Sequence, residues 1–257
     1  MKVVILAGGY GTRLSEYTSA MPKPMVPVAG KPLIWHVMKT YSHFGFKDFV
    51  IALGYKSSHI KEYFLNYRNL NSDFSINLNS GDITHLELDL VDWNVTLCDT
   101  GEHTMTGGRV KRLANVVGAA PFLLTYGDGV ANVDINRLLE FHQKGQKLIT
   151  VTAVRPPARF GELELEGDRV RSFREKPQLQ QGWINGGFFI VEPGFLKLID
   201  GDKTMLEREP LELATKMGEL MAYKHHGFWH CVDTKRDLDA LNELAAIGVP
   251  PWSIFSD

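Results

Sequence analysis

A glycine-rich stretch near the N-terminus, LAGGYGTRL at 6–14, has the residue types that bind phosphate groups. It follows a short apolar run, and Lys23 comes shortly after it, between Pro22 and Pro24. Glycines allow positive φ angles and let backbone N–H groups approach a phosphate closely. Arg13 adds a forked, permanently charged donor, and Lys23 adds a compact charge on a backbone that the prolines stiffen. The pattern predicts a site for a phosphorylated ligand, although glycines in a tight turn can also serve packing alone.

Two isolated aspartates have the surroundings expected of magnesium ligands at the ends of strands. Asp128 lies between two glycines in YGDGV at 126–130, and Asp233 lies in CVDT, shortly before a predicted helix at 238–246. Mg²⁺ takes one or two carboxylates and completes its coordination with phosphate oxygens and water. The residues alone leave two alternatives open, because Asp128 could form a turn and Asp233 could cap the helix.

Two familiar phosphate-binding patterns do not fit the chain. A dinucleotide-binding fold requires an acidic residue at the end of the second strand, where this chain has LGYK at 53–56. A P-loop requires Gly-Lys followed by Ser or Thr at the start of the helix, and the helix start lacks it. Neither pattern accounts for a lysine between two prolines.

The elements that must position these residues alternate between strands and helices. Apolar runs at 3–7, 49–53, 122–126, 148–154 and 187–191 predict buried strands. Helical spacing at 33–41, 60–64, 110–117 and 138–141, the last with Asp134 as a candidate cap, predicts helices. This alternation predicts an α/β fold with a Rossmann-like, mixed and largely parallel sheet flanked by helices. In such sheets, ligands bind outside the carboxyl ends of the strands.

Short alternating segments interrupt this rhythm and predict a small antiparallel β annex. They lie at 74–100, and at 163–165 with 170–173. No repeat or linker-like stretch divides the chain, so we expect residues 1–257 to form a single domain.

The composition excludes some classes of function. Lys plus Arg number 28 and Asp plus Glu 30, so no global charge favours binding to nucleic acid or to an anionic membrane. No apolar run is long enough for a signal-peptide core or a transmembrane helix, so a cytoplasmic location is expected. Cys98 and Cys231 match no metal-ligand spacing, and their apolar surroundings predict small buried core residues.

The combination of LAGGYGTRL at 6–14 with MPKPM at 21–25 resembles the signature of the sugar-phosphate nucleotidyltransferase family. The resemblance covers essentially the whole chain and implies the nucleotide-diphospho-sugar transferase fold. Further segments resemble the branch that uses CTP and glucose 1-phosphate: GYK at 54–56, WNVTLCDTG at 93–101, MTGGRVKR at 105–112, YGDGV at 126–130, EKP at 175–177, INGGFF at 184–189 and GFW at 227–229. Met21 and the residues before Asp233 depart from the family pattern, which bears on the identity of the acceptor.

The resemblance implies a reaction and a set of site residues. A phosphate oxygen of α-D-glucose 1-phosphate would attack the α-phosphorus of CTP and release pyrophosphate, giving CDP-glucose without a covalent intermediate on the protein. Arg13 and Lys23 are implied as catalytic residues, and Asp128 and Asp233 as the Mg²⁺ ligands. The implied nucleotide contacts are Leu6, Ala7, Gly8, Gly9, Tyr10, Gly11, Thr12, Arg13, Lys23, Thr104, Arg109 and Gly127. The implied sugar-phosphate contacts are Glu175, Lys176, Asn185 and Gly186.

The sequence also allows other interpretations. Thr104 could cap a helix and Arg109 could be a solvated surface charge, while Phe228 and Trp229 could flank the sugar pocket, belong to the core or contact another subunit. The scaffold could also act on another phosphorylated small molecule, or serve as a non-catalytic nucleotide-sensing subunit. The resemblance further implies a homo-oligomer, a hexamer, and a role in making sugars for surface polysaccharide such as O-antigen.

Overall fold

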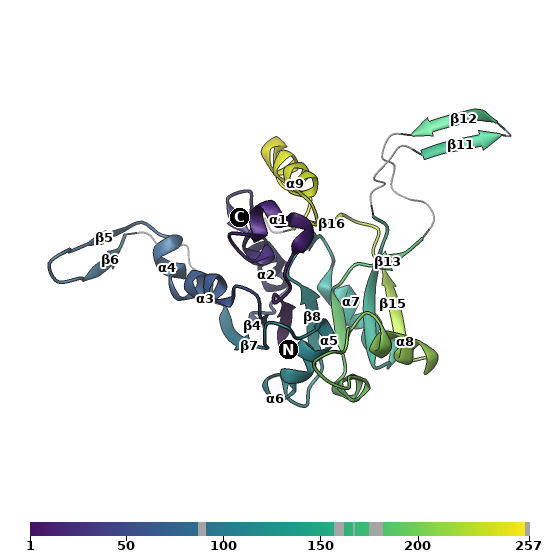
Figure 1. The fold of residues 1–257 in the computed structure, drawn as a ribbon, viewed down its shortest axis with the longest axis horizontal. Helices are drawn as coiled ribbons and strands as arrows, with labels where there is room; N and C mark the ends of the chain where they lie inside the picture. The colour runs from purple at the N-terminus through teal and green to yellow at the C-terminus, as the bar shows by residue number, and fades with distance from the viewer. Residues whose placement is uncertain (87–90, 157–161, 167, 175–181, 255–257) are drawn as a thin grey trace.

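The computed structural model describes residues 1–86, 91–156, 162–166, 168–174 and 182–254. At its centre lies a mixed sheet with eight strands among these residues (Figure 1). The strands are β1 (Val3–Leu6), β4 (Asp48–Leu53), β7 (Asn94–Asp99), β8 (Phe122–Tyr126), β10 (Ile149–Val154), β13 (Ile184–Asn185), β14 (Phe189–Val191) and β15 (Leu220–Lys224). β1 runs parallel to β4 and β8, β4 to β7, and β10 to β15, whereas β13 and β14 run antiparallel to their neighbours. The predicted α/β fold with a mixed, largely parallel sheet is confirmed.

Helices cover both faces of this sheet, as the crossovers between parallel strands require. The helices are α1 (Ser15–Thr18), α2 (Leu33–His43), α3 (Ser57–Leu65), α4 (Tyr67–Leu70), α5 (Thr106–Arg112), α6 (Ala114–Val117), α7 (Ile135–Gly145), α8 (Glu209–Lys216) and α9 (Lys235–Ile247), with 3-10 turns η1 (Thr12–Leu14), η2 (Lys23–Met25) and η3 (Pro193–Leu198). The predicted cap of α7 is confirmed, because the Asp134 side chain accepts a hydrogen bond from the backbone N–H of Arg137. Among the described helices, none has both the length and the apolar character needed to cross a bilayer.

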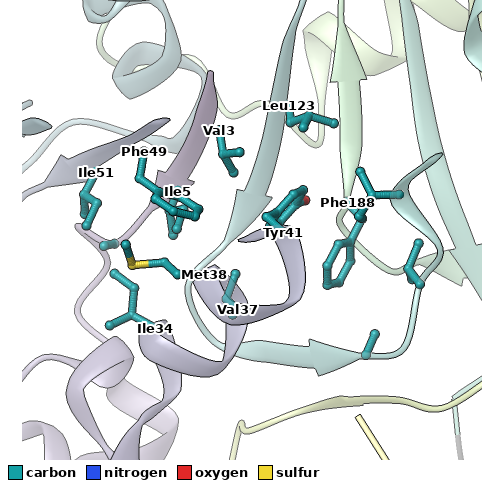
Figure 2. Close-up of a cluster of buried hydrophobic side chains, with 14 of the residues drawn as sticks. Val3, Ile5, Ile34, Val37, Met38, Tyr41, Phe49, Ile51, Leu123 and Phe188 are labelled. Atoms are coloured by element: carbon teal, nitrogen blue, oxygen red, sulfur yellow. The ribbon is translucent and has the colours of Figure 1, made fainter. Parts of the chain in front are cut away.

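The side chains of β1 alternate between two hydrophobic clusters, one on each face of the sheet. Val3 and Ile5 point to the face that α2 and α7 cover, whereas Val4 and Leu6 point to the face that α5 and α8 cover. Figure 2 shows residues of α2 against those of β1 and β4, with the ring of Tyr41 facing that of Phe188. Their ring centroids are 5.7 Å apart. Burial on both faces explains why the apolar run at the start of the chain is continuous.

Four small antiparallel ribbons accompany the main sheet in the described part of the chain. They are β2 (Pro27–Val28) with β3 (Lys31–Pro32), β5 (Phe74–Ile76) with β6 (Ile83–His85), β9 (Gly129–Ala131) with β16 (Trp229–Cys231), and β11 (Glu162–Glu166) with β12 (Arg169–Arg174). The β5–β6 and β11–β12 hairpins project away from the body of the protein on opposite sides (Figure 1). The predicted antiparallel annex is therefore confirmed for these two hairpins.

Three expectations about individual segments need correction. The annex predicted over 74–100 extends too far, because β7 at its end joins the main sheet parallel to β4. The helix predicted over 110–117 is two helices, since α5 ends at Arg112 and α6 begins at Ala114. Cys98 and Cys231 are only half-buried and carry free thiols, so the prediction that both are buried core residues is wrong.

A third hydrophobic cluster lies beneath the residues predicted to bind phosphate and metal. It includes Leu14, Val26, Val130 and Val232, together with residues of α9 and the buried Trp252. Each of these four side chains is within three positions of Arg13, Lys23, Asp128 or Asp233 in the sequence. The cluster therefore ties together four segments that are far apart along the chain.

Candidate active site

The glycine-rich stretch forms a tight turn at the carboxyl end of β1. Gly11 has a φ of 63°, in the left-handed region that glycine adopts most readily. A Cβ at this position would lie 2.9 Å from Cγ2 of Thr18 and 3.1 Å from Cβ of Lys23. The Gly11 carbonyl accepts hydrogen bonds from the backbone N–H of Leu14 at 2.9 Å and from the Thr18 hydroxyl at 3.1 Å. The turn thus depends on glycine both for its backbone conformation and for close packing against the lysine segment.

Lys23 lies between the two predicted metal ligands. Its Nζ donates to Oδ2 of Asp128 at 2.6 Å and to Oδ1 of Asp233 at 2.8 Å. The exposed Arg13 side chain donates from Nη1 to Oδ2 of Asp233 at 2.7 Å. Burial alone would lower the pKa of Lys23, but the Asp128 and Asp233 carboxylates raise it above its usual value. The lysine therefore stays charged in a site where it is 8% exposed.

An antiparallel ribbon brings the two aspartates together. Cys231 at the end of β16 pairs with Gly129 at the start of β9, and the backbone N–H of Val232 donates to the Asp128 carbonyl at 3.0 Å. Asp128 and Asp233 therefore leave the ribbon side by side. The helix-cap interpretation of Asp233 is wrong, because Thr234 caps α9 and forms a capping box with Asp237.

The donor set beside Lys23 fits a hard divalent cation. One ligand atom from each of Asp128, Cys231 and Asp233 lies within 4.8 Å of the others. Burial raises the pKa of Cys231, and the neighbouring Asp128 adds to this effect, so the thiol stays protonated. The two carboxylates are then the anionic ligands on offer, and oxygen ligands of this kind suit Mg²⁺.

A pocket of about 570 Å³ opens beside this cluster on the side of the glycine turn. Its lining includes these predicted residues: Leu6, Ala7, Gly8, Gly9, Tyr10, Gly11, Thr12, Arg13, Lys23, Thr104, Arg109 and Asp128. Gly127 does not line the pocket, but its backbone N–H donates to the Leu6 carbonyl at 3.0 Å, and a Cβ there would lie 3.1 Å from Pro24. We call this space the first pocket.

Arg109 connects the segments that form the wall of the first pocket. Its guanidinium donates to the backbone carbonyls of Gly8, Leu53, Gly101 and Glu102 and to the hydroxyl of Thr100, over distances of 2.7–3.1 Å. The side chain is 4% exposed, so the interpretation as a solvated surface charge is wrong. A Cβ on Gly8 or Gly54 would overlap the guanidinium. Both positions therefore need glycine so that the Arg109 guanidinium fits between the ends of the strands.

A second pocket of about 320 Å³ shares Arg13, Tyr126 and Asp128 with the first pocket. Its other lining residues include Asn185, Gly186, Phe188, Glu207, Trp229 and Cys231. Asn185 and Gly186 are the predicted sugar-phosphate contacts among these lining residues, and the Trp229 indole donates to the Gly186 carbonyl at 2.8 Å. Glu175 and Lys176 lie outside the described residues.

An interruption of a strand shapes this second pocket. β13 and β14 both pair with β10, and the residues between them leave the regular strand path. Gly187 has a φ of 75° and Phe188 a φ of 49°, both in the left-handed region. A Cβ on Gly186 would lie 2.6 Å from a methyl group of Val154 and 3.0 Å from the Thr152 carbonyl oxygen. The NGG sequence therefore permits a bend that opens the pocket beside Asn185.

The similarity of the chain to known proteins shows the family to which it belongs. Residues 2–242 match the family described as Nucleotidyl transferase. The chain belongs to this family. Among nucleotidyl transferases, a glucose-1-phosphate cytidylyltransferase of Salmonella typhi is 51% identical over 99% of this chain and 100% of its own length. A probable glucose-1-phosphate cytidylyltransferase of Bacillus subtilis is 40% identical over 99% of this chain and 100% of its own length.

The fold is also similar to solved structures. The crystal structure of HddC from Yersinia pseudotuberculosis superposes with a TM-score of 0.70 at 25% identity and covers 94% of this chain and 98% of its own. The expectation of a nucleotidyl transferase fold is therefore confirmed.

Several residues of this candidate site were not predicted from the sequence. Glu207 enters the second pocket from the segment before α8 and belongs to none of the quoted motifs. Glu102, His103 and Lys203 line the first pocket, and only the neighbourhood of Thr104 pointed toward two of them. Of the two aromatic candidates, Trp229 lines the second pocket, whereas Phe228 packs on Trp252 with ring centroids 5.7 Å apart.

Proposed function

We propose that this chain transfers the cytidylyl group of CTP to α-D-glucose 1-phosphate, giving CDP-glucose and pyrophosphate. The observation that carries the proposal is the meeting of two pockets at Arg13 and Asp128, with Lys23 beside them. A triphosphate in the first pocket and a phosphorylated acceptor in the second would place the two reacting phosphates together there. The cytidine and glucose assignments are supported by relatives whose names carry both, over the full length of this chain.

The described residues suit an in-line displacement at phosphorus. A phosphate oxygen of the acceptor forms a bond to the α-phosphorus of CTP, and the bond to the leaving pyrophosphate breaks. Negative charge accumulates on the phosphoryl oxygens, and Arg13 and Lys23 supply positive charge at this position. The residues of the turn at 8–12 line the first pocket, and their backbone amides would bind the triphosphate. No protein nucleophile is required, so the reaction has no covalent intermediate.

We propose Asp128 and Asp233 as the residues that hold Mg²⁺ in this reaction. When bound, the ion neutralises charge on the triphosphate. The carboxylates bind Lys23 as well, so the ammonium and the metal act on the same pair of anions. Glu175 and Lys176 stay in the proposal as sugar-phosphate contacts on the resemblance alone, and Asn185 and Gly186 are supported by their place in the second pocket.

For Arg109 we propose a positioning role in addition to a direct contact with the nucleotide. Its five hydrogen bonds, two of them to Gly8 and Glu102 in the lining of the first pocket, support a positioning role for the guanidinium, alongside any contact with the nucleotide. Thr104, which is 7% exposed and lines the same pocket, is retained as a nucleotide contact.

Pyrophosphate release tests the proposed function. The purified chain is incubated with Mg²⁺, glucose 1-phosphate and one nucleoside triphosphate at a time. We expect release with CTP and at least tenfold less with UTP, dTTP or GTP. A stronger signal from another triphosphate would reject the cytidine assignment. Binding of CTP in calorimetry without any pyrophosphate release, across a panel of phosphorylated acceptors, would instead indicate a nucleotide-sensing subunit.

The proposal extends to assembly and location. We propose a single domain over 1–257, a homo-oligomer with a hexamer as the expected state, a cytoplasmic location and a product that serves surface polysaccharide such as O-antigen. Exposed apolar side chains on and beside the β5–β6 hairpin, among them Phe74, Ile76 and Ile83, support association. Light scattering on the purified chain measures the oligomeric state, and a monomer would reject this part.

A further inference from the structure

Glu207 is held at the junction of the two pockets by a hydroxyl on each side. Tyr126 donates from its phenol to Oε1 at 2.7 Å, and Thr106 donates from Oγ1 to Oε2 at 2.6 Å. Burial raises the pKa of Tyr126, and the Glu207 carboxylate adds to this effect, so the phenol stays protonated and donates. A carboxylate offers about four acceptor positions. Two further hydrogen bonds can therefore be accepted at a wall of the second pocket.

The segment that carries Glu207 is fixed against α5, the helix that borders the first pocket. Met105 donates its N–H to the Asp202 carbonyl at 2.8 Å, and Gly108 donates to the Thr204 carbonyl at 3.2 Å. Leu206 donates its N–H to the Thr106 hydroxyl at 2.9 Å. These bonds fix the position of Glu207 from the side of the first pocket, although its carboxylate lines the second pocket.

The glycines of the MTGGR sequence make this close packing possible. A Cβ on Gly107 would lie 2.8 Å from the Thr204 carbonyl oxygen, and one on Gly108 would lie 2.6 Å from Cα of Asp202. Neither glycine lines the first pocket, although Thr106 and Arg109 on the same helix do. The pair of glycines therefore serves the placement of the 202–207 segment.

The chemistry around Glu207 favours a polyhydroxylated ligand in the second pocket. Asn185 donates from Nδ2 to the Tyr126 phenol at 3.2 Å, so the polar groups on this wall form one connected set. Phe188 and Trp229 supply apolar surface in the same pocket. A carboxylate repels phosphate but accepts hydrogen bonds from hydroxyl groups. The phosphate of an acceptor would therefore face Arg13 and its hydroxyls would face Glu207.

We propose that Glu207 is a specificity-determining residue that accepts a hydrogen bond from one hydroxyl group of the sugar-phosphate acceptor. Thr106 and Tyr126 hold the carboxylate in place for this contact. The inference rests on the proposed function, since it assigns the acceptor side of that same reaction. A polar group in a binding pocket that is built to bind a hydroxyl discriminates against analogues that lack it, because the bound analogue leaves the polar atoms of that group without a partner.

Steady-state kinetics on Glu207→Gln with deoxy analogues tests the inference. Wild type and variant are compared with glucose 1-phosphate and its 2-, 3-, 4- and 6-deoxy forms at saturating CTP. We expect Glu207→Gln to lower kcat/KM for glucose 1-phosphate about ten- to hundredfold, mainly through KM, with KM for CTP within twofold of wild type. One deoxy analogue should lose a similar factor in the wild type and almost nothing further in the variant.

Controls separate recognition from a merely structural role. Glu209, two residues further along, is exposed on the first turn of α8, and Glu209→Gln should leave every constant unchanged. Glu207→Ala should abolish the same hydroxyl preference, with CTP binding in calorimetry showing that the chain is folded. Equal losses for all deoxy analogues in wild type and variant, or an unchanged kcat/KM in Glu207→Gln, would overturn the inference alone. Absence of turnover by the wild type would overturn both the inference and the proposed function.

Discussion

At the scale of single residues, Lys23 is the cation most closely bound to the candidate metal ligands. Two carboxylates hold its ammonium at 2.6 and 2.8 Å, and a second cation, Arg13, shares one of them. The charges of the lysine and the aspartates are mutually dependent, because removal of one partner leaves buried charge without compensation. This arrangement keeps the lysine fixed at the junction of the two pockets, where the reacting phosphates are proposed to meet.

The substitution Lys23→Ala should lower cytidylyl transfer about 10²- to 10³-fold in kcat, because it removes a charge that stabilises the phosphoryl oxygens in the transition state. Single-turnover pyrophosphate release with saturating CTP and glucose 1-phosphate measures this loss. Lys47→Ala is the matched control, since Lys47 is exposed and pairs with the exposed Asp92. Near-normal turnover in Lys23→Ala would show that the lysine has no role in the chemistry.

At the scale of elements, the contact between α5 and the 202–207 segment joins the walls of the two pockets. The two segments can pack this closely because α5 has glycines at the contact. Adding one methyl group to such a glycine therefore tests whether the close packing is needed. In an ordinary helix interior, replacing glycine by alanine stabilises by about 0.5–1 kcal/mol. Here the added methyl group would lie 2.6 Å from Cα of Asp202. This neighbour is a backbone atom, which cannot move aside as the end of a flexible side chain could.

We therefore expect Gly108→Ala to destabilise the fold by about 1–3 kcal/mol, the usual cost of overpacking. Urea unfolding monitored by circular dichroism measures the change. Gly201→Ala, next to the 202–207 segment, is the control, because a Cβ at Gly201 has no atom within 4 Å, and its effect should be within about 0.5 kcal/mol. Stabilisation by Gly108→Ala would contradict the packing role assigned to the glycines.

Elements with a continuous apolar pattern were predictable from the sequence, and elements defined by their neighbours were not. β8 has the predicted bounds because its first four residues are buried. β7 was assigned to the annex because polar and apolar residues alternate along most of its sequence, NVTLCD. In the structure its residues are half-buried or exposed, as expected of a strand at the edge of a sheet. The sequence contains no local signal for which sheet such a strand joins.

The site was predictable where a motif carries the chemistry, and not where it depends on tertiary contacts. The turn at 8–13, Lys23 and the two aspartates converge as expected. The buried position of Arg109 follows from carbonyl groups on three separate segments, so no sequence pattern could indicate it. In the sequence, Glu207 looks like any acidic residue before a helix, because its hydrogen-bond partners Thr106 and Tyr126 are far away along the chain.

At the scale of the whole molecule, buried histidines link stability to pH. Burial lowers the pKa of His36, although a hydrogen bond to the Val28 carbonyl partly opposes this. The Trp252 indole donates to Nδ1 of His36 at 3.3 Å, so this nitrogen must be unprotonated in the folded chain. Burial also lowers the pKa of His225 and His230. The unfolded chain therefore binds protons at a higher pH than the folded chain does.

The free energy of unfolding should be constant above about pH 6.5, the pKa of histidine in unfolded chains, and should fall as the pH decreases below it. The slope should reach at most about 1.4 kcal/mol per pH unit for each histidine. Urea unfolding between pH 7.5 and 5.5 measures it. His36→Gln should make the slope shallower, and His59→Gln, at an exposed position, should not. Equal slopes in wild type and His36→Gln would contradict this assignment.

The central claim is that nucleotide and acceptor meet between the two pockets, at Arg13, Lys23 and Asp128. A crystal structure of the chain with Mg²⁺ and CDP-glucose tests this most directly. The account predicts the cytidine in the first pocket, the glucose in the second beside Asn185 and Glu207, and the diphosphate next to Arg13 and Lys23. A sugar nucleotide bound outside both pockets, or with its two ends exchanged, would contradict it.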